Sequence, residues 1–413
     1  MGLVLTAVYR MLTGLLAWPA GVVLSRNPNF RGTILNRLGL VLPDIPAHLP
    51  LIWIHASSMG EVRAVTGLVK ALRREKPHVI ICLSTMTATG RQIASSIPEL
   101  DVVFPFPFDA PWIMRRYLSA LSPRMLIIVE TEIWPNMIIE ARDRGIPTII
   151  VNARMTERSF RRYSMLSPLA GEILHDVHIL AISENDGNRF SRLGAGDVRA
   201  VGNLKLDSIQ DVDPARPQEV KAGLGAGQRP VFIAGSIREG EEGMVFSALA
   251  KAASNVPGLF SILAPRHPEQ IPLLKDLAER GSYRWCLKSE MKSDTDLVIV
   301  NTMGELFDLY GASDTAFVGG SLVDLGGQNI LEPLAWGVPT IHGPHMENFT
   351  WALDVVGGYT VPVGSAEELA DAVIETLTQP EKYRDMAQEA RRLLEKHKGV
   401  TERCLAVLLE YLP

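Results

Sequence analysis

Two acidic clusters in the first half of the chain have residue types and spacing suited to acid–base chemistry. In the first, the segment HASSMGE follows an apolar run and opens a helical pattern that ends its first turn with Glu61. Ser57 or Ser58 can cap that helix, and Gly60 permits a tight turn. A carboxylate there can act as a general base, because the helix dipole favours its ionised form. The alternative is an ordinary first-turn glutamate.

The second acidic cluster is formed by Glu130 and Glu132, which follow another apolar run and precede the Trp134–Pro135 pair. Pro is favourable at the first position of a helix. Two neighbouring carboxylates repel each other if both are buried and charged, which favours a catalytic or cation-paired site. The alternative is that one acid caps the helix and the other is solvated.

Basic residues follow two further apolar runs. Arg154 begins a set that continues with Arg158, Arg161 and Arg162, and such a run can bind phosphates in bidentate geometry. Lys205 ends the last apolar run before residue 207 and would suit a phosphate or a carboxylate. Solvated side chains on a helix or loop are the alternative for both sets.

Four segments in the second half together predict a nucleotide site. Each places glycines or polar side chains where an apolar run ends, and glycine lets backbone N–H groups approach a phosphate closely. Glu332 can also take a pair of ribose hydroxyls. The candidates are Ser236 and Glu239 in GSIREGEE, Arg266 and His267 in APRHP, Met303, Gly304 and Glu305 in MGEL, and Gly326, Gly327, Asn329 and Glu332 in the segment from 319 to 332.

Several signatures are absent from the sequence. It has no GxxxxGK[ST], and no GxGxxG follows the first predicted strand of either half, which disfavours a P-loop enzyme and a dehydrogenase. His342 and His345 lack a third ligand in their turn, so we expect no metal site and no cofactor. Cys82, Cys286 and Cys404 are far apart, which fits a reducing compartment.

The elements that must position these residues follow an α/β pattern. Short apolar runs alternate with amphipathic stretches, which predicts parallel sheets covered on both faces, with ligands at the carboxyl ends of the strands. The predicted strands are Leu51–His55, Val79–Ser84, Met125–Glu130, Pro147–Asn152, His178–Ser183, Val198–Gly202, Val231–Gly235, Phe260–Pro265, Asp296–Asn301, Thr315–Gly320 and Thr340–Gly343. Helices are predicted over 62–76, 134–144, 241–253, 271–280 and 367–378, with a helical tail from 380 to 412.

The 413 residues suit two domains or three, and 47% hydrophobic with 21% charged residues excludes a disordered chain. We expect a membrane anchor and lead-in over 1–40, a Rossmann-like domain over 41–206, a linker over 207–228 and a second Rossmann-like domain over 229–413. Residues 1–200 carry 22 Lys and Arg against 16 Asp and Glu, whereas the remainder carries 19 against 30. The basic half therefore suits an anionic surface or substrate, unless the difference is surface scatter.

The amino-terminal segment from Gly2 to Leu24 is apolar apart from Arg10 and a few threonines. Arg26, Arg31 and Arg37 follow it, which keeps the body of the protein on the cytoplasmic side. We interpret it as a membrane anchor, either one short span or a helix in the interface with Trp18 at headgroup depth. The alternative is a buried first helix of a soluble fold.

Taken together, these motifs resemble the bacterial 3-deoxy-D-manno-octulosonic acid (Kdo) transferases of lipopolysaccharide biosynthesis, and the resemblance covers nearly the whole chain. The motifs that carry it are HASSMGE, TMTATG, ETEIWPN, NARMTERS, GNLKLD, APRHPE, NTMGEL, GGSLVDLGGQNILEP and GPHMENF.

The resemblance implies a GT-B glycosyltransferase with two Rossmann-like domains facing a cleft. It implies transfer of Kdo, with inversion and without metal, from CMP-Kdo to a glucosamine hydroxyl of a lipid A precursor (lipid IVA) at the cytoplasmic side of the inner membrane. No nucleic-acid partner is expected.

By motif, the resemblance makes Glu61 the general base, and Glu130 and Glu132 an acidic motif of open roles. Donor contacts fall on the second-half candidates above and on Ser58, Gly60, Arg154 and Lys205. Two other hypotheses remain open: another GT-B enzyme, such as a UDP-sugar transferase or epimerase, and a non-catalytic membrane adaptor.

Overall fold

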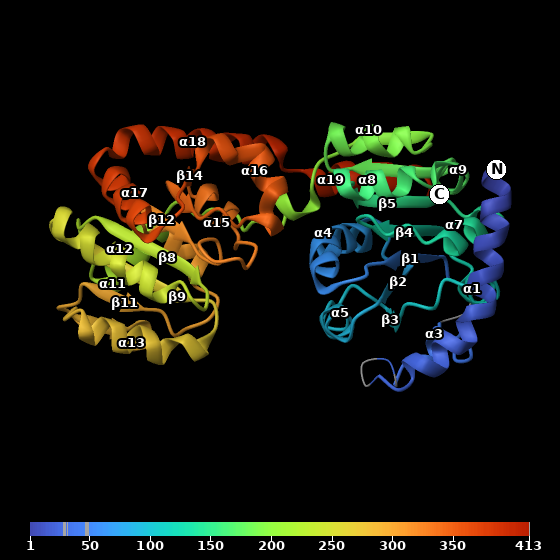
Figure 1. Ribbon diagram of the computed structural model, residues 1–413, viewed down its shortest axis with the longest axis horizontal. Coiled ribbons are helices and arrows are strands. Elements are labelled where there is room, and N and C mark those ends of the chain that lie inside the picture. Colours follow the sequence, from blue (N-terminus) through green and yellow to red (C-terminus); the bar gives the residue numbers. More distant parts are fainter. Residues whose placement is uncertain (28–29, 31, 46–48, 413) are drawn as a thin grey trace. The chain divides into compact units, whose positions relative to one another are not determined.

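The computed structural model describes residues 1–27, 30, 32–45 and 49–412, so Arg31 lies outside the described residues. The chain forms two compact units (Figure 1). Unit 1 comprises Met1–Ser208 and Lys398–Pro413, and unit 2 comprises Ile209–His397. The chain therefore enters unit 2 once and returns to unit 1 at its end.

The described residues of unit 1 form a seven-stranded sheet of order β3-β2-β1-β4-β5-β6-β7, and every pairing is parallel. The order reverses between β1 and β4, and open α/β sheets bind ligands at the carboxyl ends of such a pair. The strands are β1 Leu51–His55, β2 Ile80–Thr85, β3 Val102–Pro105, β4 Met125–Val129, β5 Thr148–Ala153, β6 Val177–Ala181 and β7 Asp197–Ala200. The helices are α1 Gly2–Leu24, α3 Ile34–Arg37, α4 Met59–Glu75, α5 Ala88–Ala94, α6 Pro111–Leu121, α7 Pro135–Arg142, α8 Glu157–Ser164, α9 Ser167–Leu174, α10 Glu184–Arg192, the short η1 Leu204–Leu206 and α19 Val400–Glu410.

Two apolar cores cover the two faces of this sheet, and the alternation of side chains along β1 feeds both. Leu51 and Trp53 belong to the core under α6, α7 and α9, whereas Ile52 and Ile54 belong to the core under α4 and α19. Buried on both faces, β1 can hold the segment that follows it in a fixed position.

Unit 2 has the same design. Its described residues form a seven-stranded sheet of order β10-β11-β9-β8-β12-β13-β14, again parallel throughout, with the reversal between β8 and β12. The strands are β8 Val231–Ile237, β9 Phe260–Pro265, β10 Trp285–Leu287, β11 Leu297–Ile299, β12 Thr315–Val318, β13 Thr340–His342 and β14 Val361–Pro362. The helices are α11 Arg216–Leu224, α12 Glu242–Asn255, α13 Ile271–Arg280, α14 Leu306–Gly311, α15 Leu331–Ala335, α16 Thr350–Val356, α17 Ala366–Thr378 and α18 Pro380–His397, with short η2 Pro268–Gln270, η3 Lys288–Glu290, η4 Glu347–Phe349 and η5 Gly357–Tyr359.

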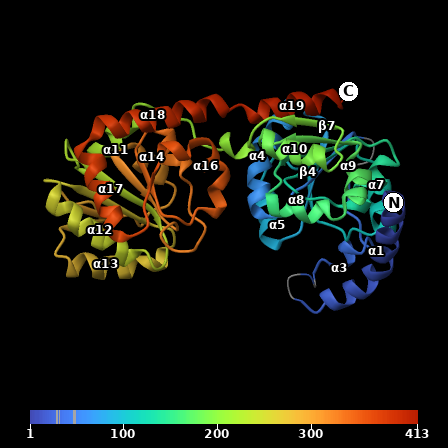
Figure 2. The same cartoon turned by 45° about the horizontal axis from the view of Figure 1, so that its top comes forward.

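The predicted class of two doubly wound α/β domains is confirmed, and two domain boundaries differ. Residues 398–413 belong to unit 1, although the sequence pattern assigned them to the second domain. Gly399, at φ +80°, breaks the predicted continuous tail, and α19 then packs on α4 of unit 1 (Figure 2). The predicted linker contains α11, which belongs to unit 2.

The lead-in also differs from expectation at Arg37, which is fully buried. Its guanidinium donates to the carbonyl oxygens of Met86 at 2.7 Å and Phe106 at 3.0 Å. Arg37, which the sequence grouped with the basic residues after the anchor, instead ties α3 to the segments that follow β2 and β3.

Candidate active site

Glu61 lies at the reversal point of unit 1, in the first turn of α4 directly after β1. Its Oε2 accepts a hydrogen bond from the backbone N–H of Ser57 at 2.7 Å, and its Oε1 accepts one from the Ser58 hydroxyl at 2.9 Å. Ser58 is also the N-cap of α4 and accepts from the Glu61 N–H. The carboxylate is therefore held in one orientation.

Burial dominates the electrostatics of this carboxylate. Only 7% of Glu61 is exposed, and burial raises its pKa to about 7. The contacts with Ser57 and Ser58 lower the pKa, while the negative charges of Glu130 and Glu132 raise it. A carboxyl group with this pKa exchanges its proton near neutral pH, which a general base requires.

The TMTATG segment and Arg37 hold the loop that carries Glu61 in place. The Thr85 hydroxyl and the Met86 N–H both donate to the Ser57 carbonyl oxygen, at 3.0 and 3.1 Å. A Cβ on Gly90 would lie 2.5 Å from the Thr85 Oγ1 and 2.8 Å from the Thr87 Oγ1, so a side chain there would displace these hydroxyls. Arg37 holds the Met86 carbonyl, and thereby fixes the segment against which the Glu61 loop rests.

Glu130 and Lys205 form an ion pair at the same edge of the sheet. Lys205 Nζ lies 2.9 Å from Glu130 Oε1, and both side chains are about one third exposed. Glu130 adopts φ +63°, a conformation rare for a residue with a side chain. The sequence left a cation-paired acid as one reading of this cluster, and the structure identifies Lys205 as the cation.

Asn152, at the end of β5, positions the loop that carries Lys205. Its Oδ1 accepts from the Leu204 N–H at 2.9 Å, and Asn203 caps η1 by accepting from the Lys205 N–H at 3.0 Å. Asn152 also adopts a positive φ, of +53°. Nearby, the Thr131 hydroxyl donates to the Arg154 carbonyl oxygen, which joins the ends of β4 and β5.

Glu132 is the third acid of this cluster. Burial raises its pKa, and the charge of Glu130 raises it further. The structure therefore brings Glu61, Glu130, Glu132 and Lys205 together, with Lys205 paired directly to Glu130.

In unit 2, Glu241 organises the reversal point between β8 and β12. This residue is fully buried, and its two carboxylate oxygens accept four backbone N–H groups at 2.6–2.9 Å. The donors are Arg238, Gly320, Ser321 and Leu322. Glu241 has no predicted role from sequence, because a second acid in GSIREGEE looks like a helix-opening residue.

Asn329, Glu332 and Arg266 form a polar group in unit 2. Asn329 Nδ2 donates to Glu332 Oε1 at 3.0 Å. Burial raises the pKa of Glu332, and the Asn329 contact and the charge of Arg266 lower it. These three predicted residues therefore lie within reach of one another.

The glycines of the same loop are required by close approach. A Cβ on Gly326 would lie 2.3 Å from Asn348, and one on Gly327 would lie 2.4 Å from the Met346 sulfur. Both residues have positive φ. They hold the GPHMENF segment against the loop, so their role here is packing between segments.

The other residues predicted for the nucleotide site lie at the carboxyl edge of the unit 2 sheet. In the described structure they do not join the Glu241 or the Asn329–Glu332–Arg266 groups. Ser236 adopts φ +54° at the end of β8, and Gly304 adopts φ +85° before α14. Glu305 accepts from the Thr302 hydroxyl at 2.7 Å. Met303 is 83% exposed. Glu239 and His267 are also exposed.

One local expectation is wrong. Gly60 lies within α4, has no positive φ, and has room for a Cβ, so no tight turn requires it. The turn before α4 is instead fixed by the Ser57 and Ser58 contacts.

Among the described residues, one group could hold a metal ion by proximity: the side chains of Asp324, His345 and Glu347. The two acids are exposed, and nothing else at this place points to an ion. Both ring nitrogens of His342 have partners within the protein: Nδ1 lies 2.7 Å from the Gly343 carbonyl oxygen, and Nε2 lies 3.1 Å from the Thr360 hydroxyl.

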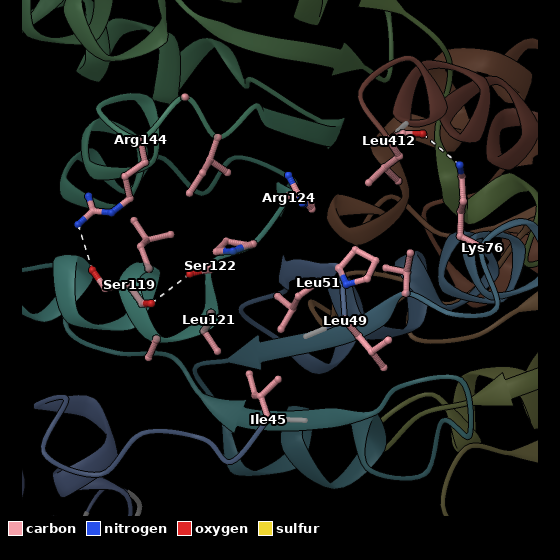
Figure 3. Close-up of a pocket in the computed structure, with 17 residues that line it drawn as sticks. Ile45, Leu49, Leu51, Lys76, Ser119, Leu121, Ser122, Arg124, Arg144 and Leu412 are labelled. Carbon is pink, nitrogen blue, oxygen red and sulfur yellow. Dashed lines mark hydrogen bonds between the residues drawn. The ribbon is translucent and has the colours of Figure 1, made fainter. Parts of the chain in front are cut away.

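A large pocket in unit 1 lies away from these acids. It encloses about 1230 Å³ and is lined by Leu49, Leu51, Arg124, Arg144 and Leu412 among others (Figure 3). Leu51 begins β1, whereas the Glu61 segment follows its end, so the pocket lies at the opposite edge of the parallel sheet. Ligands of open α/β sheets bind at the carboxyl edge, so we place the candidate site at Glu61.

Comparison with known proteins adds family information. A family described as "3-Deoxy-D-manno-octulosonic-acid transferase (kdotransferase)" matches residues 33–208. A 3-deoxy-D-manno-octulosonic acid transferase of Haemophilus influenzae is 31% identical over 95% of this chain and 94% of its own length. The one of Bordetella pertussis is 32% identical over 91% of each chain.

Among solved structures, a putative UDP-N-acetylglucosamine 2-epimerase from Listeria monocytogenes has a TM-score of 0.59 at 14% identity. The match covers 88% of this chain and 97% of that one. At this identity the similarity establishes the two-domain fold alone.

Proposed function

This chain belongs to the Kdo transferase family, and on that premise we propose the substrates it uses and the residues that carry its reaction. It is a glycosyltransferase that transfers Kdo in lipopolysaccharide biosynthesis. The donor in our proposal is CMP-Kdo, and the acceptor is a glucosamine hydroxyl of a lipid A precursor such as lipid IVA. The reaction inverts the anomeric carbon.

Glu61 is the general base in this proposal. Its carboxylate takes the proton of the acceptor hydroxyl as the oxygen bonds to the anomeric carbon of Kdo, and the bond to the CMP phosphate breaks with its electron pair leaving on CMP. The observation that carries this role is a buried, oriented carboxylate whose pKa is about 7. Glu130 is already paired with Lys205, which leaves it less suited to accept the proton.

Lys205 is the cation that we assign to the anionic donor. It is about one third exposed and held by Glu130, so an incoming carboxylate or phosphate can share it. Because Glu130 and Glu132 would otherwise repel an anionic sugar, the lysine charge is needed at this edge. Gly60, Ser58 and Arg154 then act mainly by shaping the loops around Glu61 and Lys205.

Unit 2 binds the nucleotide in this proposal. Glu332, oriented by Asn329 and close to Arg266, takes the ribose hydroxyls, and Arg266 adds positive charge for the phosphate. Glu241 positions the loops around Ser236 and Gly320 by holding their backbone. The cations required for the leaving CMP are supplied by side chains, and the proposal includes no metal.

We place the enzyme at the cytoplasmic side of the bacterial inner membrane, where a lipid A precursor with acyl chains and phosphates resides. Helix α1 supports this location, since its 23 residues include an 18-residue window with a mean hydropathy of 1.4, of which only 11% is buried.

The decisive experiment replaces Glu61 with Gln and measures Kdo addition to lipid IVA from CMP-Kdo by mass spectrometry. We expect turnover to fall by about 10²–10⁴-fold, with CMP binding unchanged. Glu184→Gln is the matched control, because Glu184 occupies the first turn of α10 after β6 but is exposed. Equal activity of both variants would overturn the assignment of Glu61, and absence of Kdo-lipid product with the unmodified protein would overturn the reaction.

A further inference from the structure

Helix α1 has two opposite faces. The buried positions Thr6, Ala17 and Gly21 recur at helical spacing and face unit 1, together with Arg10 and Thr13. The opposite face is apolar and exposed, and consists of Val4, Val8, Met11, Leu12, Leu15, Leu16, Val22 and Val23. We call these eight residues the α1 outer face.

Contacts with unit 1 run along nearly the whole helix. At its start a Cβ on Gly2 would meet the Pro168 carbonyl oxygen at 2.5 Å, and near its end one on Gly21 would meet Leu38 at 3.0 Å. Between them, the Tyr9 hydroxyl donates to Asp109 at 3.0 Å. Figures 1 and 2 both show α9 next to the start of α1. The contacts extend over about 29 Å of helix, nearly the thickness of a bilayer core.

The centre of this contact is charged. Arg10 of α1 lies 2.6 Å from Glu140 of α7, which also pairs with Arg144 at 2.8 Å and Arg115 at 3.1 Å. Only 3% of the Glu140 side chain is exposed. If α1 spanned a bilayer in this arrangement, α7, α9 and these ions would enter the hydrocarbon, which is prohibitively costly.

Exposed basic and apolar residues lie on the segments that precede α9, near the start of α1. The Gly2 contact places it next to α9, and the segment that leads into α9 exposes Met165 to 75% and Leu166 to 51%. Directly before it, α8 exposes Arg158, Arg161 and Arg162, although Arg161 shares its charge with Glu157 at 3.2 Å. Apolar side chains beside arginines match the acyl region and the anionic headgroups of a lipid surface.

We propose that α1 lies flat in the surface of an anionic bilayer, with its outer face in the acyl region and the α8 arginines on the headgroups, and does not span the membrane. This inference deepens the membrane location in the proposed function and rests on it. Unit 1 is then held with a fixed side towards the lipid, since the Arg10–Glu140 pair and the Tyr9–Asp109 bond fix the rotation of α1.

Depth measurements test the orientation of α1. Single cysteines at Val4, Leu12 and Val23 can be spin-labelled in the full chain, because the native Cys82, Cys286 and Cys404 are buried. In vesicles of phosphatidylethanolamine and phosphatidylglycerol, we expect all three labels at one shallow depth. A profile with Leu12 at the bilayer centre and the two ends at opposite surfaces would overturn the proposal.

Vesicle binding tests the surface itself. Leu12→Glu with Leu16→Glu should abolish binding, and Arg158→Glu, Arg161→Glu and Arg162→Glu together should weaken binding to anionic vesicles by about 10- to 100-fold. Leu273→Glu and Arg392→Glu in unit 2 change equally exposed positions and should have no effect. Unchanged binding of the α1 and α8 variants would overturn the proposal, as would a dimer in solution that Leu12→Glu dissociates.

These outcomes are separable from those of the activity assay. Binding is measured without substrates, and turnover is measured with acceptor dispersed in detergent. Loss of vesicle binding with full turnover in detergent supports the proposed membrane-binding surface. Absent turnover with normal vesicle binding contradicts only the proposed reaction.

Discussion

At the scale of single residues, the fold destabilises the charged form of the Glu61 carboxylate. Its two hydrogen bonds offset only part of the desolvation, and two further acids add repulsion, so its pKa rises to about 7. Stored unfavourable charge of this kind is typical of functional sites. His55, at the end of β1, shows the contrast: burial lowers its pKa to about 3, and it is a neutral ring packed on Phe106.

The raised pKa predicts the pH dependence of activity. Because the base form of Glu61 exists above pH about 7, kcat/KM should fall about tenfold for each pH unit below that value. Initial rates of Kdo transfer against pH measure this, with Glu61→Gln expected to show a low, flat profile. A wild-type profile without an inflection near neutrality would contradict the assignment.

The same shift predicts that Glu61→Gln stabilises the protein at alkaline pH. The folded state binds this proton more tightly than the unfolded state, whose pKa is near 4.5, so the destabilisation is full above pH about 7 and disappears towards pH 4.5. The gain is on the order of 3 kcal/mol at most. Calorimetry at pH about 8 and about 5 should show a higher melting temperature of the variant mainly at the alkaline pH, and a lower one there would contradict the shift.

At the scale of elements, the reversal point of unit 2 joins its two strands through one close contact. In unit 2, a Cβ on Gly319 would lie 2.5 Å from the Ser236 carbonyl oxygen and 2.8 Å from the Ile237 Cα. These are backbone atoms of β8, so they cannot rotate away as a side chain can. The ends of β8 and β12 can therefore approach each other this closely only because Gly319 has no side chain.

Gly319→Ala should destabilise unit 2 by about 1–3 kcal/mol or more, because the added methyl overpacks two strand ends. Gly243→Ala, in α12 of the same unit, should stabilise it by about 0.5–1 kcal/mol, since its Cβ would meet no atom within 4 Å. Denaturant unfolding measures both effects. If the two substitutions changed the free energy of unfolding equally, the close approach of Gly319 to β8 would not be rigid.

Much of this fold is readable from sequence, for identifiable reasons. β1 and β9 were predicted with their observed bounds, because buried parallel strands read as continuous apolar runs. β3, β10 and β14 were missed: they are edge strands of two to four residues, too short for a pattern. Glu61 was found from its place after a strand, whereas the Glu130–Lys205 pair joins residues 75 positions apart and needs the folded chain.

Other features leave no local signal. Glu241 and Arg37 act through backbone groups of distant segments, and a sequence shows only a surface-type charged residue at each position. The prediction that α19 belongs to the second domain was wrong for a similar reason, since the sequence of an amphipathic helix does not indicate which sheet its apolar face covers.

At the scale of the whole molecule, unit 1 is completed by the last residues of the chain. Val400, Cys404, Leu405 and Leu408 of α19 are buried in the core that also contains Ile52 of β1. Asp207 accepts from the N–H groups of Gly399 and Thr401, at 2.8 and 2.5 Å. The unit that carries Glu61 is therefore not a continuous stretch of sequence.

Removal of residues 398–413 should unfold unit 1 and leave unit 2 protected in hydrogen exchange followed by mass spectrometry. A milder test is Leu408→Ala, which should cost unit 1 about 2–5 kcal/mol, with the exposed Glu402→Ala as control. If peptides of unit 1 keep their protection after the truncation, α19 is not part of its core.

The docked position of α1 has a consequence for how the protein is made. α1 is synthesised well before Glu140 of α7 and the residues of α9, and at about 5–20 residues per second this delay lasts roughly 6–30 s. During that time the apolar helix lacks its partners in α7 and α9. Nascent chains therefore reach the lipid, or a chaperone, as a bare hydrophobic segment first, and the Arg10–Glu140 pair closes only after translation has passed α7.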